Sequence, residues 1–277
     1  MSKGFFKKIR KDKITIIFRK EIRELIRNKE ILVTVILMPI VFSVLIPMSM
    51  ITLSLAEEQE IPEGDQISEI FRNLANYWDE STDLQKVTIV QTNLYLAFLI
   101  MIPMIVPMAI SSDSVAGEKE RKTIEGLLAA PLTKEEILIG KALAAAVPSI
   151  VISWVAEIIY IIITDIIVYN LMGGRLILPN LFSAIMFFLL MPTQTLLSTL
   201  LMTSFSSKAK GSREALQKSG FFAMPIIFLV SALIFLPLLV HPVLTLVSEL
   251  IMIGIMFIIL KRATKNFNRD KLLSVGS

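Results

Sequence analysis

Long apolar stretches alternate with short charged segments along this chain of 277 residues. Each stretch holds 19 to 27 residues, enough at about 1.5 Å per helical residue to cross a hydrocarbon core of roughly 30 Å. The pattern predicts an all-α integral membrane protein. Its six predicted transmembrane helices are residues 31–56, 87–112, 142–168, 179–203, 221–240 and 242–260.

The predicted spans divide the chain into three parts. Residues 1–30 form a cytoplasmic N-terminus, residues 31–260 the six-span domain, and residues 261–277 a cytoplasmic tail. The first span should be retained in the mature protein, because its 26 residues exceed the roughly 7 to 15 of a signal-peptide apolar region. Within the domain, residues 57–86 form an outer loop and residues 113–141 a cytoplasmic segment.

Basic residues fix the predicted orientation. Residues 1–30, 113–141, 204–220 and 261–277 hold 11, 5, 4 and 5 Lys or Arg, which is 25 of the 28 in the chain. Lys and Arg accumulate in cytoplasmic segments, and an even number of spans places all four segments on one side. We therefore expect a multi-pass protein of the cell membrane with both termini in the cytoplasm. The net charge of +4 reflects this topology and gives no sign of nucleic-acid binding.

The composition narrows the chemistry that the chain can perform. Hydrophobic residues make up 54% of it and the mean hydropathy is +0.70, well above a soluble domain of this length. The chain has no cysteine and a single histidine, His241, so thiolate sites and histidine-rich metalloprotease sites are excluded. We expect no bound metal and no catalytic residue in this chain.

An amphipathic helix is predicted before the first span. Apolar residues recur there at helical spacing, with charged residues on the other face. Such a helix suits the inner membrane surface, its apolar face toward the acyl chains and its basic face toward anionic head groups. It is either a topology anchor or a connector to another protein. The apolar residues are Ile14, Ile17, Phe18, Ile22, Leu25 and Ile26.

A second, shorter helix is predicted over residues 118–130. Glu118 with Lys122 and Arg121 with Glu125 are spaced i,i+4, and such pairs stabilise a helix by about 0.2 to 0.5 kcal/mol each. The helix should stop at Pro131 and lie crosswise between two spans. Thr133 and Glu136 then have the spacing of a capping box, which predicts the start of the helix that becomes the third span.

Two stretches of sequence resemble a known family. The run AGEKERKTIE over residues 116–125, with Leu127, Leu128, Pro131 and Gly140-Lys141 after it, resembles the cytoplasmic motif of ABC-2 type permeases. The run KEIRELIRNK over residues 20–29, leading to a span with Pro39, resembles the connector helix and first span of that family. The NatB-like sodium-exporter branch is the most similar.

The resemblance implies a permease subunit of an ATP-binding-cassette exporter with an unidentified substrate: an ion, a drug or a lipid-like molecule. A separate ATPase subunit would bind ATP-Mg, since this chain lacks the G-x-x-x-x-G-K-[ST] phosphate loop. A second permease copy or a paralogue would complete the transporter. The implied coupling residues are Glu118, Glu120, Arg121, Thr123, Glu125, Leu127, Leu128 and Pro131, and the implied connector residues are Glu21, Arg23, Glu24 and Arg27.

Three acids fall within predicted spans: Glu157, Asp165 and Glu249. A carboxylate inside a bilayer is costly unless it is protonated, paired or hydrated. Asp165 is expected to be solvated at the outer end of its span, whereas Tyr160 and Ser153 are placed to hydrogen-bond Glu157. Glu157 and Glu249 therefore belong either to a structural polar network or to an ion or substrate site. The latter supports the alternative function, a secondary transporter or channel driven by an ion gradient.

Overall fold

The computed structural model describes residues 10–45, 47–49, 77–123, 130–206, 213–215 and 250–258, together with eight single residues outside these ranges: 52, 72, 126, 211, 217, 221, 225 and 247. All regular structure in these ranges is helical. The larger helices are α1 (Lys11–Arg27), α2 (Lys29–Ile40), α5 (Asp83–Phe98), α6 (Met101–Glu120), α8 (Lys134–Val168) and α10 (Met191–Ser206). The shorter ones are η1 (Val41–Leu45), η2 (Trp78–Glu80), α9 (Leu181–Ile185) and η3 (Met186–Leu190).

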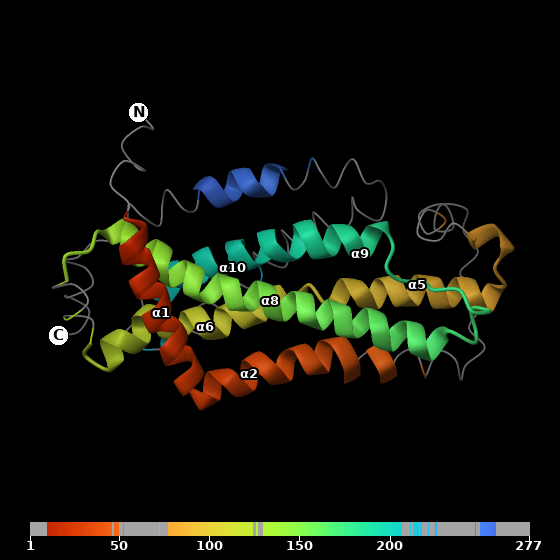
Figure 1. The fold of residues 1–277 in the computed structure, drawn as a ribbon, viewed down its shortest axis with the longest axis horizontal. Coiled ribbons are helices and arrows are strands. Elements are labelled where there is room, and N and C mark those ends of the chain that lie inside the picture. The colour runs from red at the N-terminus through yellow and green to blue at the C-terminus, as the bar shows by residue number, and fades with distance from the viewer. Residues whose placement is uncertain are drawn as a thin grey trace.

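The long helices lie side by side, and α1 crosses them at one end (Figure 1). Four helical stretches of the described residues are long and apolar enough to cross a membrane. They correspond to the first four predicted spans, whereas most of residues 221–240 and 242–249 lies outside the described ranges, so a total of six remains a prediction. The four stretches are Lys29–Ser49, Asp83–Glu120, Glu136–Val168 and Leu181–Thr203.

The second span is longer than predicted and is broken in the middle. Instead of residues 87–112 it consists of α5 and α6, separated by a turn at Leu99 and Ile100. Pro103 explains the break, because proline has no N–H to donate to the carbonyl four residues earlier and its ring clashes with that carbonyl. The backbone there forms hydrogen bonds to the residue three positions earlier instead of four, from Leu99 N to Leu96 O (3.0 Å) and from Ile102 N to Leu99 O (3.0 Å).

The predicted start of the third span is confirmed. Thr133 caps α8, its hydroxyl accepting from Glu136 N while the Glu136 carboxylate accepts from Thr133 N. The helix then runs to Val168, and Gly173 and Gly174 turn the chain with φ of +63° and +82°. The capping box thus fixes one end of the longest described helix, at the end of the bundle that α1 crosses (Figure 1).

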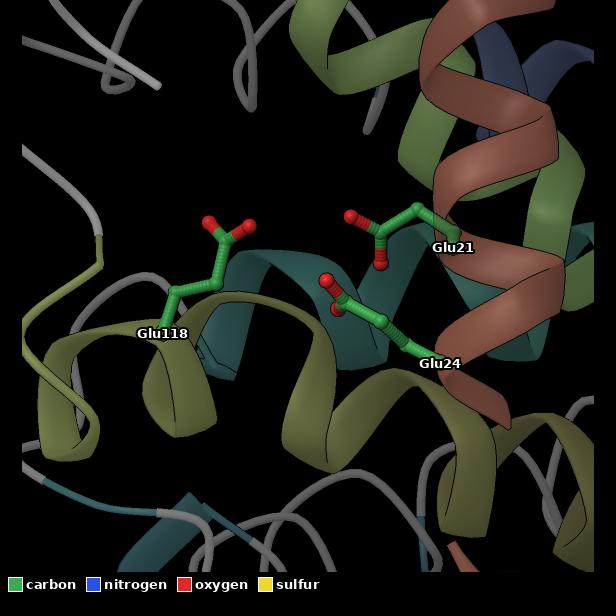
Figure 2. A group of neighbouring side chains, drawn as sticks. All are labelled: Glu21, Glu24 and Glu118. Carbon is green, nitrogen blue, oxygen red and sulfur yellow. The ribbon is translucent and has the colours of Figure 1, made fainter. Parts of the chain in front are cut away.

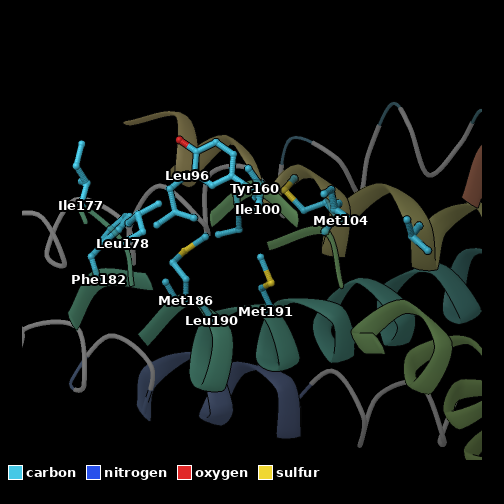
Figure 3. Close-up of a cluster of buried hydrophobic side chains, with 14 of the residues drawn as sticks. Leu96, Ile100, Met104, Tyr160, Ile177, Leu178, Phe182, Met186, Leu190 and Met191 are labelled. Atoms are coloured by element: carbon cyan, nitrogen blue, oxygen red, sulfur yellow. The ribbon is translucent and has the colours of Figure 1, made fainter. Parts of the chain in front are cut away.

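A buried apolar cluster runs along the bundle and holds it together. It joins α5 and α6 to the α9–η3–α10 segment and to the middle of α8 (Figure 3). Its members come from elements far apart in sequence, so packing between helices, and not only the bilayer, orders them. Those labelled in the figure are Leu96, Ile100, Met104, Tyr160, Ile177, Leu178, Phe182, Met186, Leu190 and Met191.

The predicted amphipathic helix exists as α1, but its apolar residues do not all face one environment. Ile17 is 2% exposed and lies against Gly140 of α8, and Leu25 packs on the apolar cluster. Ile26 is 63% exposed. The prediction that the whole apolar face meets acyl chains was therefore wrong for Ile17 and Leu25, because α8 offers a glycine that a helix can approach closely.

Candidate coupling site and intramembrane acid

A buried ion-pair network joins three helices at the end of the bundle that α1 crosses. The Lys141 ammonium of α8 lies 2.7 Å from Glu21 Oε1 of α1 and 3.2 Å from Glu118 Oε2 of α6. It also donates to the Ser114 carbonyl of α6. The Lys141 side chain is fully buried and that of Glu118 is 1% exposed. We name Lys20, Glu21, Glu118 and Lys141 the coupling network.

Lys20 completes the coupling network from α1. Its ammonium contacts Glu118 directly and lies 3.6 Å from Glu21 Oε1 and 3.4 Å from Glu24 Oε1. Burial alone would lower the pKa of Lys20, but the hydrogen bond to Glu118 and the attraction of Glu118, Glu21 and Glu24 raise it above its usual value. Burial raises the pKa of Glu21, and the Lys141 ammonium opposes this only in part.

Three carboxylates of this region, Glu21, Glu24 and Glu118, point toward one another (Figure 2). Their oxygens lie within 4.8 Å of one another, close enough to share a cation. Lys141 and Lys20 already place two ammonium groups among these oxygens. The positive charge that the carboxylates need is therefore supplied by the chain itself, and a metal ion would have to displace a buried lysine.

The predicted helix over residues 118–130 differs from the structure at its start. Helix α6 continues through Glu120, so Glu118 belongs to the last turns of a span helix and not to a separate crosswise helix. Lys122 adopts a left-handed φ of +56° and ends α6, with Thr123 N donating to Glu118 O. The predicted pair of Glu118 with Lys122 is wrong, because Glu118 turns inward to lysines of α1 and α8.

Arg121 has a partner that was not predicted, while its predicted partner Glu125 lies outside the described residues. It pairs with Asp113, at 3.1 Å between Nη1 and Oδ2, across two turns of α6. Gly117 makes this possible, since a Cβ there would lie 2.0 Å from Asp113 Oδ1 and 3.1 Å from Arg121 Nη1. Gly117 therefore leaves the space that this ion pair occupies.

The exposed surface beside the coupling network carries the other predicted coupling residues. Glu120, Arg121, Thr123 and Pro131 are all exposed. The Pro131 carbonyl accepts a 2.7 Å hydrogen bond from Arg10, which also pairs with Glu136 at 3.0 Å. The predicted coupling residues Glu125, Leu127 and Leu128 lie outside the described residues.

The predicted connector residues of α1 divide between two faces. Glu21 pairs with Lys141 of α8, whereas Glu24 pairs with Lys20 of its own helix and is exposed, as are Arg23 and Arg27. Arg23 and Arg27 line a shallow groove with Phe18, Ile22 and Ile26. Glu21 thus holds α1 on the bundle, and the two arginines remain accessible.

Within the bundle, Glu157 has surroundings that differ from those predicted. Its side chain is fully buried, and neither carboxylate oxygen has a hydrogen-bond partner among the residues that the structure describes. Tyr160 instead donates to Thr92 O of α5 at 2.6 Å, and Ser153 donates to Ser149 O of its own helix at 2.8 Å. The expected hydrogen bonds from Tyr160 and Ser153 to Glu157 are therefore absent.

Asp165, two turns further along α8, is satisfied by the backbone. Its Oδ1 accepts from Ile177 N at 3.1 Å and from Leu178 N at 3.3 Å, and the residue is 9% exposed. The prediction that solvent satisfies Asp165 was wrong, because the segment after α8 folds back over it. The third acid, Glu249, lies outside the described residues.

Sequence reasoning missed the lysines of the coupling network. Lys141 appears in the sequence only as the residue after Gly140, and Lys20 only as one charge of an amphipathic helix. A lysine followed by an apolar run could have signalled burial for Lys141. Its partner Glu21 is 120 residues away, so the pair itself could not be predicted from spacing.

Comparisons with known proteins agree with this architecture. No curated protein matches the chain. A family model described as ABC-2 family transporter protein matches residues 15–256, a range that includes most of α1, the coupling network and all four described spans. Because the match covers most of the sequence, the chain belongs to the ABC-2 family of membrane transporter proteins.

Proposed function

We propose that this chain is the permease subunit of an exporter whose ATP is hydrolysed by a separate nucleotide-binding subunit. Membership of the ABC-2 family supports a transport component that works with an ATP-binding subunit. The observation that carries the proposal is the coupling network, which ties α1, α6 and α8 together at one end of the bundle. The substrate is an ion, a drug or a lipid-like molecule.

The ATPase subunit docks at this end, which is the cytoplasmic one. The exposed residues Glu120, Arg121, Thr123 and Pro131 contact it, together with Arg23 and Arg27 of α1. A push on the exposed surface moves the end of α6, and the contacts of Glu118 with Lys20 and Lys141 pass this movement to α1 and α8. Interfaces of this kind move as units because packed charged groups resist independent sliding.

The assembly contains two permeases, either two copies of this chain or this chain with a paralogue. Its place is the cell membrane, with the N-terminus and the C-terminus in the cytoplasm. The distribution of Lys and Arg supports this orientation, because 25 of 28 fall in the four segments of one side. Spans five and six complete the transmembrane domain.

The test is co-purification with the candidate ATPase subunit and ATP hydrolysis by the reconstituted complex. We compare the wild type with the double variant Glu120→Arg/Thr123→Arg, which changes exposed residues only. The control is Asp79→Arg, since the Asp79 side chain is 73% exposed and belongs to the predicted outer loop. We expect the double variant to lose the ATPase subunit and the control to retain it. Equal retention by both variants would refute docking at this surface.

A second comparison separates docking from coupling. Glu118→Gln weakens the coupling network without changing the exposed surface, because the Glu118 side chain is 1% exposed. We expect this variant to co-purify with the ATPase subunit while ATP hydrolysis no longer responds to the permease. Normal stimulation in Glu118→Gln would show that movement passes through other contacts.

A further inference from the structure

The six predicted spans contain acidic residues but no Lys or Arg. Residues 31–56, 87–112, 142–168, 179–203, 221–240 and 242–260 hold no Lys and no Arg, yet they include Glu157, Asp165 and Glu249. A buried carboxylate is normally stabilised by a nearby cation or by several hydrogen-bond donors. Glu157 therefore cannot obtain a basic partner from within the spans of its own chain.

Among the described residues, Glu157 also has no hydrogen-bond donor. Both of its oxygens are buried and without a partner there, and the Thr92 hydroxyl on α5 is buried and without a partner too. Tyr160, one turn from Glu157, connects this part of α8 to α5, because its hydroxyl donates to the Thr92 carbonyl. Polar groups left unsatisfied in a bundle interior require an explanation.

Several buried hydroxyls of α8 and α10 are satisfied within their own helices, although others, such as those of Ser111 and Ser198, lack a partner among the described residues. Ser149 and Ser153 of α8, and Thr195, Thr199 and Thr203 of α10, are all buried, and each donates to a backbone carbonyl four residues earlier. These hydroxyls satisfy themselves within their own helices. When it is ionised, Glu157 cannot do the same, since a carboxylate only accepts hydrogen bonds.

The backbone that Trp154 contacts is irregular. Trp154, one turn before Glu157, donates its indole N–H to the Phe187 carbonyl at 2.7 Å, and Phe187 lies in the π-helix η3. Short π-helical segments free carbonyls from the regular ladder and occur often at functional sites. Residues on either side of Glu157 thus contact α5 and η3, two elements that a ligand between them would touch.

We propose that Glu157 is the carboxylate of an intramembrane site that binds a positively charged group of the exported substrate. The group is a small monovalent metal ion or a protonated amine, and both would neutralise the carboxylate in the same way. Thr92 Oγ1 and the carbonyls of η3 and α5 are the accompanying oxygens. Without the ligand, Glu157 holds a proton, because a lone carboxylate in a bilayer interior is too costly. The inference rests on the proposed export function and names its substrate class.

The test uses a hydrophobic carbodiimide, which reacts with protonated carboxyl groups inside membranes. The purified permease in lipid nanodiscs is labelled in a buffer whose only cation is the bulky N-methylglucamine, and modified peptides are identified by mass spectrometry. Sodium, potassium or methylammonium chloride is then added in parallel samples. We expect labelling of Glu157 in the first buffer and at least a tenfold decrease with the cation that binds. Glu157→Gln is the control for the labelled peptide.

Thermal unfolding of the same samples gives an independent readout. The binding cation should raise the unfolding temperature of the wild type and leave Glu157→Gln unchanged, because a ligand stabilises only the protein that binds it. An effect of sodium or potassium alone assigns a metal ion, and an effect of methylammonium alone assigns an amine. Thr92→Val should weaken the effect, since it removes the second unsatisfied oxygen.

The proposal is overturned if no cation protects Glu157 and none stabilises the wild type more than Glu157→Gln. That result means that Glu157 carries a proton only. The outcome is independent of the ATPase experiment, because no ATPase subunit is present. If the ATPase docks and couples but no cation binds, the export function stands and the substrate is not cationic.

Discussion

Ile17 of α1 lies so close to Gly140 of α8 that a Cβ on Gly140 would come within 2.8 Å of the Ile17 Cβ and Cγ2 atoms. The next residue along α8 is Lys141, which reaches Glu21 one turn further along α1. Close approach of the two helices and burial of the lysine are therefore one arrangement: without a glycine at 140, the ammonium at 141 would lie too far from its carboxylate.

Substitution of Gly140 should destabilise the contact between α1 and α8. A methyl group added by Gly140→Ala forces Ile17 or the helix to shift, and overpacking of this kind costs about 1 to 3 kcal/mol. We expect a lower unfolding temperature in detergent, and partial recovery in Gly140→Ala/Ile17→Ala. The control is Gly254→Ala, because nothing lies within 4 Å of a Cβ at that helical position. Equal effects of both alanines would contradict the packing argument.

Removal of Lys141 should be more damaging than removal of its partner. Lys141→Met leaves Glu118 buried with Lys20 as its remaining cation, and loss of one partner of a buried ion pair costs about 3 to 5 kcal/mol. Adding Glu118→Gln to Lys141→Met removes the uncompensated charge, so the double variant should be more stable than Lys141→Met. Chemical denaturation of the four proteins measures the coupling energy. Additive effects would show that the two groups do not interact.

Asp165 should stabilise the fold through the hydrogen bonds that its side-chain oxygen accepts and not through its negative charge. Asp165→Ala leaves the N–H groups of Ile177 and Leu178 unpaired and buried, at about 1 to 3 kcal/mol each. Asp165→Asn keeps an oxygen at the same place and should lose much less stability. Thermal unfolding of the two variants decides between these roles. Equal losses would mean that the negative charge itself is required.

The contribution of Lys20 should depend on pH only at the alkaline end. Its pKa is raised above the usual 10.5, so the stability that it contributes is complete below about pH 10.5 and is lost as the pH rises through the raised value. The difference in unfolding temperature between the wild type and Lys20→Met should be constant from neutral pH to about pH 10, and should then decrease. A difference that changes near neutral pH would point to another group.

Sequence patterns predicted the local features of this fold well and its long-range contacts poorly. The helix before the first span, the capping box at Thr133 and four of the six spans follow from periodicity and hydropathy, which depend on nearby residues. The break at Leu99 depends on Pro103, a local signal that marks a kink but not its size. The inward turn of Glu118 depends on Lys20 and Lys141. These two lysines are far in sequence from each other, and neither is a sequence neighbour of Glu118.

The candidate sites were predicted in a similarly partial way. Glu157 stands out in the sequence because a charged residue inside an apolar run is rare, but its lack of partners is visible only in three dimensions. The family motif marked residues 116–125 as functional without separating buried Glu118 from exposed Glu120. Periodicity cannot make that separation, because the last turns of α6 contact α1 on one side and are exposed on the other.

The coupling network also constrains how the chain is made. Helix α1 leaves the ribosome early, yet Lys141 follows its last residue, Arg27, by 114 positions. The residues that α1 contacts in the coupling network are therefore all present only after the second span and the start of the third have been synthesised. Until then Glu21 has no Lys141 to bind, so α1 stays at the membrane surface without its contact to α8. Docking of α1 on the bundle is thus a late step of biogenesis. It takes place only when the third span has entered the bilayer correctly.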